Sequence, residues 1–371
     1  MPLPELFEEA RRQLNICNAC RYCEGYCAVY PALERRTELS ERDFAHLANL
    51  CHDCRDCLYA CMYAAPHEFA VDPPALFLAF RRAPNGAGRG HVPRLFGSSA
   101  RMPLLGLAFV IAGVTITLSA TTAPGGLASL TAAGSTARSP YSVIPYPVLV
   151  TWSGAVALVA VALMALGAAR YWREIHGSYR DLGNVAALSR AAGYAATLHY
   201  QRGGGEECTY PGAEPSPTRR RLHALVAYGF SACLASTISA GVLQDGLGTP
   251  PPYPWASAPV ILGVLGGAIM LAGGAGLIVL KRRHLHLTRS DGRGTPPGDV
   301  GLLTALCVLA ASGLLTLFLR TTQAFGPLFL LHLIAVVTCF AIAPFTSFPH
   351  FVFRYLSIVQ DNLERAAALG T

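Results

Sequence analysis

Charged residues are scarce in this chain of 371 residues, of which 14% are Asp, Glu, Lys or Arg and 52% are hydrophobic. The mean hydropathy is +0.38, and much of the apolar excess lies beyond residue 100. This composition excludes a wholly soluble protein and indicates membrane spans. The net charge of +7 does not indicate a nucleic-acid binder, because the arginines collect beside apolar segments rather than on one soluble face.

Two further absences narrow the fold and the cofactors. Runs of β-branched residues, which a strand-rich ferredoxin needs, are almost missing from residues 31–50. That segment indicates a helix instead, with Ser40 as its cap and with Glu41 and Asp43 in its first turn. The glycine groups "GAGRG" and "RGGGEE" follow no expected strand, so the chain lacks a flavin-binding fingerprint. A flavin that works with this protein is therefore expected in another polypeptide.

Cysteine, by contrast, occurs in a duplicated pattern in the first sixty residues. The spacing C-x2-C-x2-C-x3-C is found at Cys17, Cys20, Cys23 and Cys27, and again at Cys51, Cys54, Cys57 and Cys61. It is the ligand run of bacterial two-cluster ferredoxins, in which three cysteines hold one [4Fe–4S] cluster and the fourth binds the other. We expect one cluster on Cys17, Cys20, Cys23 and Cys61, and the other on Cys51, Cys54, Cys57 and Cys27.

Zinc sites and disulfides are the alternatives. Zinc prefers four thiolates at an isolated site rather than two interleaved sets. Disulfide scaffolds belong to short secreted chains, and no signal peptide is seen before this segment. Thiolate ligands also favour a reducing compartment, so we expect this domain in the cytoplasm. The proline that commonly follows the fourth cysteine is replaced by Ala28 and Met62.

Six apolar segments follow, each near the roughly 20 residues that a bilayer core requires. They are Pro103–Ala120, Val148–Ala169, His223–Val242, Val260–Leu280, Val300–Leu319 and Leu328–His350. The loop 170–221 contains eight arginines, whereas loops 121–147 and 243–258 contain only Arg138 and Asp245 as charged residues. Because positively charged loops stay inside, we expect six crossings of a bacterial inner membrane with both termini in the cytoplasm.

The expected architecture is all-α. It comprises a helical two-cluster ferredoxin-like domain (1–80), a Gly/Pro/Arg linker (81–102), a six-helix cytochrome b-like membrane bundle (103–356) and a cytoplasmic C-terminal tail (357–371).

Three histidines fall within or at the ends of these spans, where an ionisable side chain is costly and is therefore a functional hypothesis. His223 opens the third span and His350 closes the sixth, both at the cytoplasmic face. This depth-matched pair is the arrangement needed to bind a b-type haem iron from both sides. The alternative is a pair of interfacial histidines bonded to lipid headgroups or carbonyls.

His332 lies near the outer end of the same sixth helix, about 27 Å from His350 at 1.5 Å per residue. A second haem, a quinone contact and a packing role are all open for it, since no second histidine shares its depth. His199, His284 and His286 lie in basic loops and are interpreted as surface residues.

The segment 198–221, "LHYQRGGGEECTYPGAEPSPTRRR", is rich in glycine and proline. It is either an ordered turn region or a tether. Cys208 within it is interpreted as an ordinary thiol, with a contact near a partner's cofactor as the alternative.

Several motifs together resemble a known family. The cysteine segments "NICNACRYCEGYCAVYPALERR" and "CHDCRDCLYACMYAAPHEF" are also similar to the all-helical ferredoxin of heterodisulfide reductase and succinate dehydrogenase iron–sulfur subunits. With "APVILGVLGGAIMLAGGAGLIVLK" and "LHLIAVVTCFAIAPFTSFPHFVFR" they resemble the tricarballylate/citrate utilisation protein B family. They also resemble the C-terminal half of the fused flavin–haem–iron–sulfur protein of cobalamin synthesis. The sixth span is weakly similar to the cytochrome b subunit of membrane nitrate reductase, which uses four histidines for two haems.

The resemblance implies a membrane electron-transfer subunit that reoxidises a partner FAD-dependent dehydrogenase. Two [4Fe–4S] clusters and b-type haem, one or two, would pass the electrons to the quinone pool. A haem-less iron–sulfur anchor or redox sensor is the alternative. Substrate chemistry at a cluster is disfavoured, because all eight N-terminal cysteines are used as ligands.

Overall fold

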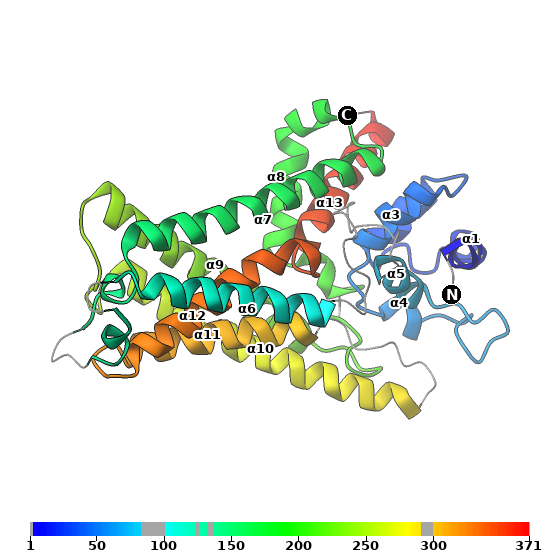
Figure 1. Cartoon of the computed structure of the whole chain (residues 1–371). Helices are drawn as coiled ribbons and strands as arrows, with labels where there is room; N and C mark the ends of the chain where they lie inside the picture. The colour runs from blue at the N-terminus through cyan, green and yellow to red at the C-terminus, as the bar shows by residue number, and fades with distance from the viewer. Residues whose placement is uncertain are drawn as a thin grey trace.

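The computed structural model describes residues 3–82, 101–123, 126–132, 137–205, 207–290 and 300–370, with the side chains of 101–105, 107, 127, 129 and 286–290 outside the description. Helices dominate these ranges (Figure 1). The described part contains no β-strand and only one isolated bridge, between Thr209 and Pro215. The all-α prediction is therefore confirmed for the described residues.

The N-terminal domain contains five short helices around an aromatic core. They are α1 (Leu3–Cys20), α2 (Val29–Glu34), α3 (Glu41–Leu50), α4 (Asp56–Tyr59) and α5 (Pro73–Arg82). Helix α3 begins as the sequence predicts: Asp43 N–H donates to Ser40 Oγ, and Ser40 N–H donates to the Asp43 carboxylate at 2.9 Å. Phe44 on α3 stacks on Phe80 of α5 with ring centroids 5.3 Å apart, which closes the core beneath the cysteine loops.

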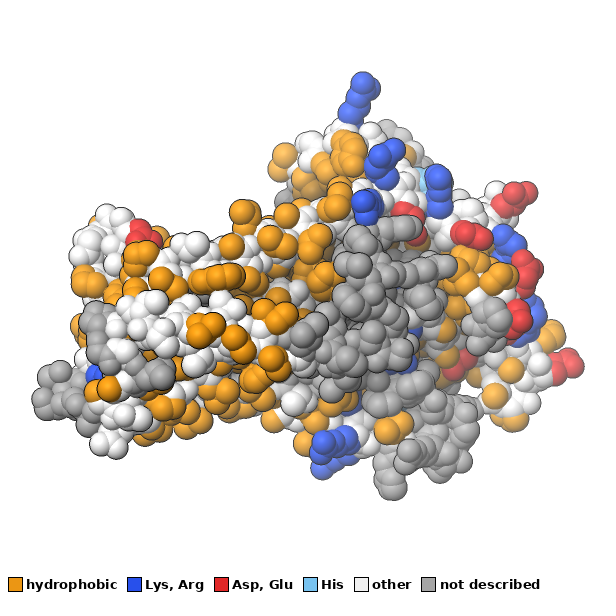
Figure 2. All heavy atoms as spheres, viewed as in Figure 1, with side chains coloured by type: hydrophobic (Ala, Val, Ile, Leu, Met, Phe, Trp, Pro, Cys, Tyr) orange, Lys and Arg blue, Asp and Glu red, His pale blue; other side chains and the backbone are white. Residues whose placement is uncertain are grey.

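The second part is a bundle of long apolar helices, visible as the elongated left half of Figure 1 and the mostly orange surface of Figure 2. Its helices are α6 (Arg101–Ala120), α7 (Tyr146–Glu174), α9 (Thr218–Gly241), α10 (Ala258–Ser290), α11 (Val300–Phe318) and α12 (Phe325–Ile342). Five stretches in the described residues are long and apolar enough to cross a membrane: Tyr146–Glu174, Thr218–Gly246, Ala258–Leu285, Val300–Phe318 and Phe325–Phe345. The crossing expected at Pro103–Ala120 coincides with α6, and it stays a prediction because part of that helix lacks described side chains.

Small residues bring α9 and α10 into backbone contact. A Cβ on Gly229 would lie 2.8 Å from the Gly266 carbonyl oxygen, and one on Gly266 would lie 2.9 Å from the Cys233 nitrogen. Packing of this kind suits helices in lipid, where water provides no hydrophobic driving force.

The sixth predicted span is not one helix. Helix α12 ends at Ile342, a 3-10 turn spans Ala343–Phe345, and α13 (His350–Leu369) then begins. Pro344 and Pro349 lack the backbone N–H that a continuous helix needs, so the chain ends one helix and starts another there. The expectation that His332 and His350 share a helix is therefore wrong. Helix α10 also continues to Ser290, through the basic segment expected to be a loop.

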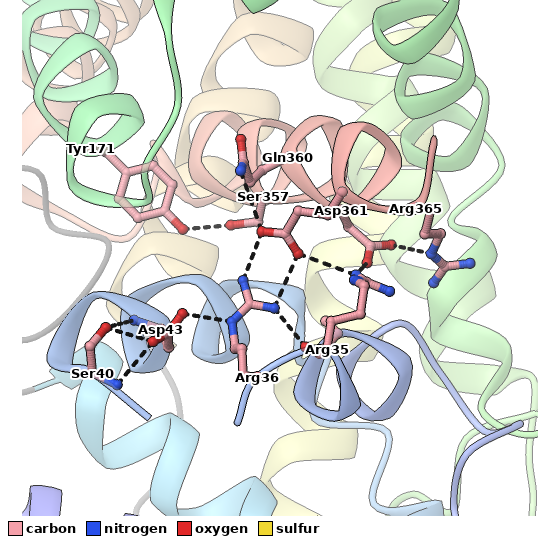
Figure 3. Close-up of polar contacts among 11 residues, drawn as sticks. Arg35, Arg36, Ser40, Asp43, Tyr171, Ser357, Gln360, Asp361 and Arg365 are labelled. Atoms are coloured by element: carbon pink, nitrogen blue, oxygen red, sulfur yellow. Dashed lines mark hydrogen bonds and ion pairs between the residues drawn. The ribbon is translucent and has the colours of Figure 1, made fainter. Parts of the chain in front are cut away.

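Helix α13 leaves the bundle and packs against α3, α7 and α8 (Val185–Ala196). Figure 3 shows its contact with the N-terminal domain, where Arg35 and Arg36 meet the acidic residues of α13. Arg36 pairs with Asp43 at 2.6 Å and with Glu364 at 2.8 Å. Arg35 pairs with Asp361, whose buried carboxylate also lies 2.9 Å from Arg365. A single helix thus crosses the boundary expected at residues 356 and 357 and joins the bundle to the cysteine domain.

Candidate iron–sulfur and haem sites

The first group of cysteines surrounds one cavity at the end of α1. Cys17, Cys20, Cys23 and Cys61, which we name the first quartet, line it together with Cys57. Arg21 turns the backbone there through a left-handed conformation with φ +56°, which is uncommon for a residue other than glycine. Cys20 is exposed, so this cavity lies at the surface of the domain.

The second group, Cys27, Cys51, Cys54 and Cys57, is the second quartet and lies deeper. Cys51 and Cys54 are each only 8% exposed. Arginines from distant segments bind the backbone between them: Arg81 donates to the Cys51 carbonyl at 3.2 Å, and Arg219 donates to the His52 carbonyl at 3.2 Å. The second quartet therefore lies where α9 meets the N-terminal domain.

Within each quartet, neighbouring cysteines raise one another's pKa. Burial raises the pKa of the Cys17 thiol to about 12, and nearby Cys61, Cys23 and Cys20 act in the same direction. Burial likewise raises the pKa of Cys27, with Cys54 and Cys51 as the next causes. Thiols this close cannot all ionise unless positive charge lies among them.

Iron–sulfur clusters fit this arrangement better than zinc does. Four zinc ligands must all lie about 2.3 Å from one ion, and no group of three or more Cys, His, Asp or Glu side chains in the described ranges converges on a single ion. In a [4Fe–4S] cluster each thiolate binds a different iron, so the sulfurs stay further apart.

The loop between α8 and α9 closes over the second quartet. The Asp56 carboxylate accepts hydrogen bonds from the backbone N–H groups of Gly204 and Thr209, both at 2.9 Å. A Cβ on Gly203, whose φ is +57°, would overlap Asp56. Of the two possibilities for this segment, the ordered turn region is therefore correct for the described residues.

Cys208 in this loop is buried against the second quartet, which its place in the sequence does not indicate. It is 1% exposed and its Sγ lies 2.8 Å from the Gln201 carbonyl oxygen. Its thiol also lies in hydrogen-bonding reach of Cys54, and this contact is the main cause that lowers the pKa of Cys208. Cys208 thus contacts a cysteine of the second quartet within this chain, and the expected alternative, a contact near a partner's cofactor, stays a prediction.

His223 and His350 come together at the end of the bundle nearest the N-terminal domain. Their ring centroids are 6.2 Å apart and their planes are 84° apart. Two imidazoles that bind one metal from opposite sides place their ring centroids about 6 Å apart, since each metal–nitrogen bond is about 2 Å long.

Each of the two rings has a nitrogen that is left free of hydrogen bonds to the described residues. His350 Nδ1 lies 2.8 Å from the Ser347 carbonyl, which leaves Nε2 for the metal. His223 Nδ1 is buried and has no hydrogen-bond partner among the described residues. The two side chains could therefore hold a haem iron between them.

Arg354 lies one helical turn after His350 and adds positive charge between the two candidate centres. It makes no hydrogen bond or salt bridge within the described part of the chain. Burial lowers the pKa of Arg354 to about 9, Arg81 and Arg219 act in the same direction, and Cys51 and Asp53 oppose them. Cationic surroundings of this kind suit negatively charged cofactors on either side.

His332 lies apart from this pair. Its Nδ1 is 3.0 Å from Ser312 Oγ, and a Cβ on Gly313 would lie 2.9 Å from its Cε1. Within the described residues it makes no ring contact with another histidine. Of the roles open to His332, packing of α12 on α11 agrees best with these contacts.

The prediction that His284 is a surface residue is wrong. Its side chain is 5% exposed, its Nδ1 lies 2.6 Å from the Pro211 carbonyl, and its ring stacks on Tyr210 with centroids 4.4 Å apart. Burial arises because α10 continues past the expected end of its span and meets the loop. His199 is exposed as expected, and the side chain of His286 lies outside the described residues.

Comparisons with known proteins agree with this architecture. Residues 98–370 match the family model described as citrate utilization protein B, and residues 10–87 match the Fer4-like domain of the same family. The chain is 36% identical over 369 residues to citrate utilization protein B of Escherichia coli, an alignment that covers 98% of this chain and 94% of the relative. No solved structure matches the chain. The Fer4-like domain and the apolar helices make this an iron–sulfur protein of a membrane electron-transfer type, and the chain belongs to the citrate utilization protein B family.

Proposed function

We propose that this protein carries electrons from a partner FAD-dependent dehydrogenase to the quinone pool of a bacterial inner membrane. The observation that supports this most directly is spatial: both cysteine quartets and the His223–His350 pair lie at one end of the bundle. With the basic loop 170–221 inside, that end and both termini are cytoplasmic.

Each centre has its own residues in this proposal. The first quartet holds one [4Fe–4S] cluster, and the second quartet holds the other. His223 and His350 hold a b-type haem, which supplies a one-electron carrier next to the membrane. Ser347 fixes the orientation of His350, and Arg354 and Arg219 offset negative charge in the space between the cluster and the haem.

The proposal assigns FAD as the two-electron donor and quinone as the lipid-soluble acceptor. The chain has no flavin fingerprint, so the FAD belongs to a separate dehydrogenase. Two clusters and a haem let the reduced flavin deliver its electrons one at a time. The quinone is the acceptor that shares the bilayer with the bundle.

The alternative function, a haem-less iron–sulfur anchor or redox sensor, predicts the same clusters without the haem. The unpartnered Nδ1 of His223 and the 6.2 Å spacing of the two rings favour the haem.

The test uses the full chain in lipid nanodiscs. We expect a low-spin b-type haem spectrum that is lost in His223→Ala and in His350→Ala, while the electron paramagnetic resonance signals of both clusters remain. His332→Ala is the matched control in the same bundle and should keep that haem. If His223→Ala retains a full haem spectrum and normal quinone reduction, the proposed haem site is wrong.

The electron path is tested by stopped-flow spectroscopy. The reductant is the flavoprotein that co-purifies with the full chain, with its FAD reduced photochemically. Wild-type clusters and haem should be reduced in succession, and a quinone analogue added afterwards should reoxidise them. Wild-type clusters that stay oxidised with every FAD-dependent partner would overturn the proposed function.

A further inference from the structure

The exposed apolar side chains of the N-terminal domain are gathered at one place. Across residues 3–82, the exposed large hydrophobic side chains are Tyr22, Met62 and Phe69, with 58%, 62% and 38% of their surface accessible. Tyr22 lies between two cysteines of the first quartet, and Met62 directly follows the last one. Tyr22 and Met62 line the first-quartet cavity, and Phe69 packs on Tyr63, another lining residue, with ring centroids 5.7 Å apart. We name these three residues the entry patch.

The second quartet is less open in the described structure: Cys57 reaches the first-quartet cavity, whereas Cys51 and Cys54 are each only 8% exposed. The loop that carries Cys208 and Thr209 covers Cys54, and Arg81 and Arg219 bind the backbone beside it. Cys51 packs within the main hydrophobic core together with residues of α13. A redox protein that approaches from the aqueous side therefore comes closest to the first quartet, whose Cys20 is exposed.

We propose that the entry patch is the docking surface for the flavoprotein that donates electrons, and that the first quartet is the point of entry. This inference rests on the proposed function and adds the order of the centres: flavin, first quartet, second quartet, haem. Electron transfer weakens steeply with distance, so the donor must bury the exposed edge of the first cluster. An apolar centre that both partners remove from water is typical of protein interfaces.

The charge at the edge of the entry patch identifies the kind of surface that fits it. Two carboxylates, Glu24 and Glu68, are exposed and make no ion pair among the described residues. Two arginines also border the patch, but Arg12 is paired with Glu9, and Arg21 donates to the Asn18 carbonyl. A complementary donor presents Lys or Arg around an apolar centre. The same carboxylates disfavour an anionic lipid surface. Figure 1 also shows α1, which ends at Cys20, at the end of the molecule away from the bundle, where a membrane-bound quinone does not reach.

The experiment compares Met62→Glu and Tyr22→Glu with Val185→Glu, a control on α8 whose wild-type side chain is 74% exposed. The readout is the rate of cluster reduction at limiting concentrations of the photoreduced flavoprotein. We expect both patch variants to slow this rate roughly tenfold or more, as for an interface hot spot. The added carboxylates also lower the potential of the first cluster, so docking is read from the flavoprotein concentration that gives half the maximal rate, which should rise about tenfold. The potential of the second cluster should stay unchanged. Val185→Glu should behave as wild type.

A second pair of variants covers the case in which a patch substitution prevents cluster assembly. Glu24→Lys together with Glu68→Lys leaves the cavity lining intact and reverses the charge at the edge. We expect slower reduction by the flavoprotein, with a rate that no longer falls as salt is added. Equal rates for all variants and wild type would overturn the docking surface while leaving the proposed function standing. If the patch variants change the oligomeric state and leave the rate unchanged, the proposal is also wrong. The entry patch would then bind a second copy of this chain instead of the flavoprotein.

Discussion

The two quartets have identical cysteine spacing and opposite surroundings. The first opens to solvent beside exposed Cys20 and Met62, whereas the second is covered by segments that come from far along the chain. Arg81 lies 30 residues from Cys51, and the loop residue Thr209 lies 153 residues from Asp56. The same cysteine spacing can therefore lie at the surface or against the membrane domain. The rest of the fold decides which segments cover each quartet.

The ion network of α13 shows how the second quartet is held in place. Arg35 and Arg36 follow α2, which starts just after Cys27, and they pair with Asp361 and Glu364. The Asp361 side chain is fully buried, and burial raises its pKa despite the neighbouring Arg365 and Arg35. Buried ion pairs add little net stability compared with apolar packing, but they impose one geometry. We interpret the network as a device that fixes the cysteine domain against the helix that carries His350.

The largest expected effect breaks one quartet and leaves the other. Cys61→Ser should remove the cluster that Cys17, Cys20 and Cys23 share with it, because the fourth cysteine of each run binds the distant cluster. Iron and sulfide analysis should fall from about eight of each in the clusters to about four, and the cluster that remains should be the enclosed one. Loss of the second cluster instead would show that each run binds its own cluster.

The next effect concerns the ion network that joins α13 to the cysteine domain. Asp361→Asn leaves Arg35 and Arg365 without their shared carboxylate, and breaking a buried pair costs about 3 kcal/mol or more. Hydrogen exchange of the α13 amides should report a correspondingly lower opening free energy. Glu8→Gln is the control, since its pair with Arg11 is exposed and such pairs contribute below about 1 kcal/mol. Equal exchange in the two variants would contradict the role given to the network.

The same interface should be sensitive to acid through His46 on α3. Burial lowers the pKa of His46 to about 3, with nearby Arg36 as the next cause, and both ring nitrogens lack a partner in the described residues. The unfolded or opened state takes up a proton near pH 6.5, so stability is complete above that pH and is lost as pH falls from about 6.5 toward 3. The slope is about 1.4 kcal/mol per pH unit.

The measurement is hydrogen exchange of α3 and α13 between pH 6.5 and 5, corrected for intrinsic exchange rates. His46→Leu should flatten the dependence, whereas exposed His199→Ala should leave it unchanged. An unaltered slope in His46→Leu would assign the acid sensitivity to another group.

The smallest effect distinguishes the two clusters by potential. Hydrogen bonds to cluster sulfurs stabilise the reduced, more negative state. A Cys54 thiolate that binds iron has no proton to donate, so it accepts a hydrogen bond when the Cys208 S–H turns to it from the Gln201 carbonyl. Cys208→Ala removes this donor, so the potential of the second cluster should fall and that of the first should stay constant. A redox titration followed by electron paramagnetic resonance measures both, with Cys233→Ala in the bundle as the control. A shift in both clusters would point to a general loosening of the domain.

The sequence by itself determined the class of the protein and the chemistry it carries. The duplicated cysteine spacing, the Ser40 cap and the apolar lengths are local signals, and each depends on residues only a few positions apart. His223 and His350 meet in the structure, whereas their common depth in the membrane stays a prediction. The single helix expected to carry His332 and His350 is wrong. Pro344 and Pro349 interrupt the apolar segment that was expected to be one helix, and hydrophobic periodicity does not detect such a break.

Only the tertiary structure decided which quartet is open and which is covered. Sequence motifs describe residues a few positions apart, and they do not predict contacts between distant segments. Such contacts are made by Cys208, His284, Arg219 and the ion network of α13. They form because closing a longer loop costs little extra entropy. The environment of each cluster, and with it the direction in which electrons can enter, is therefore a property of packing rather than of the cysteine motif.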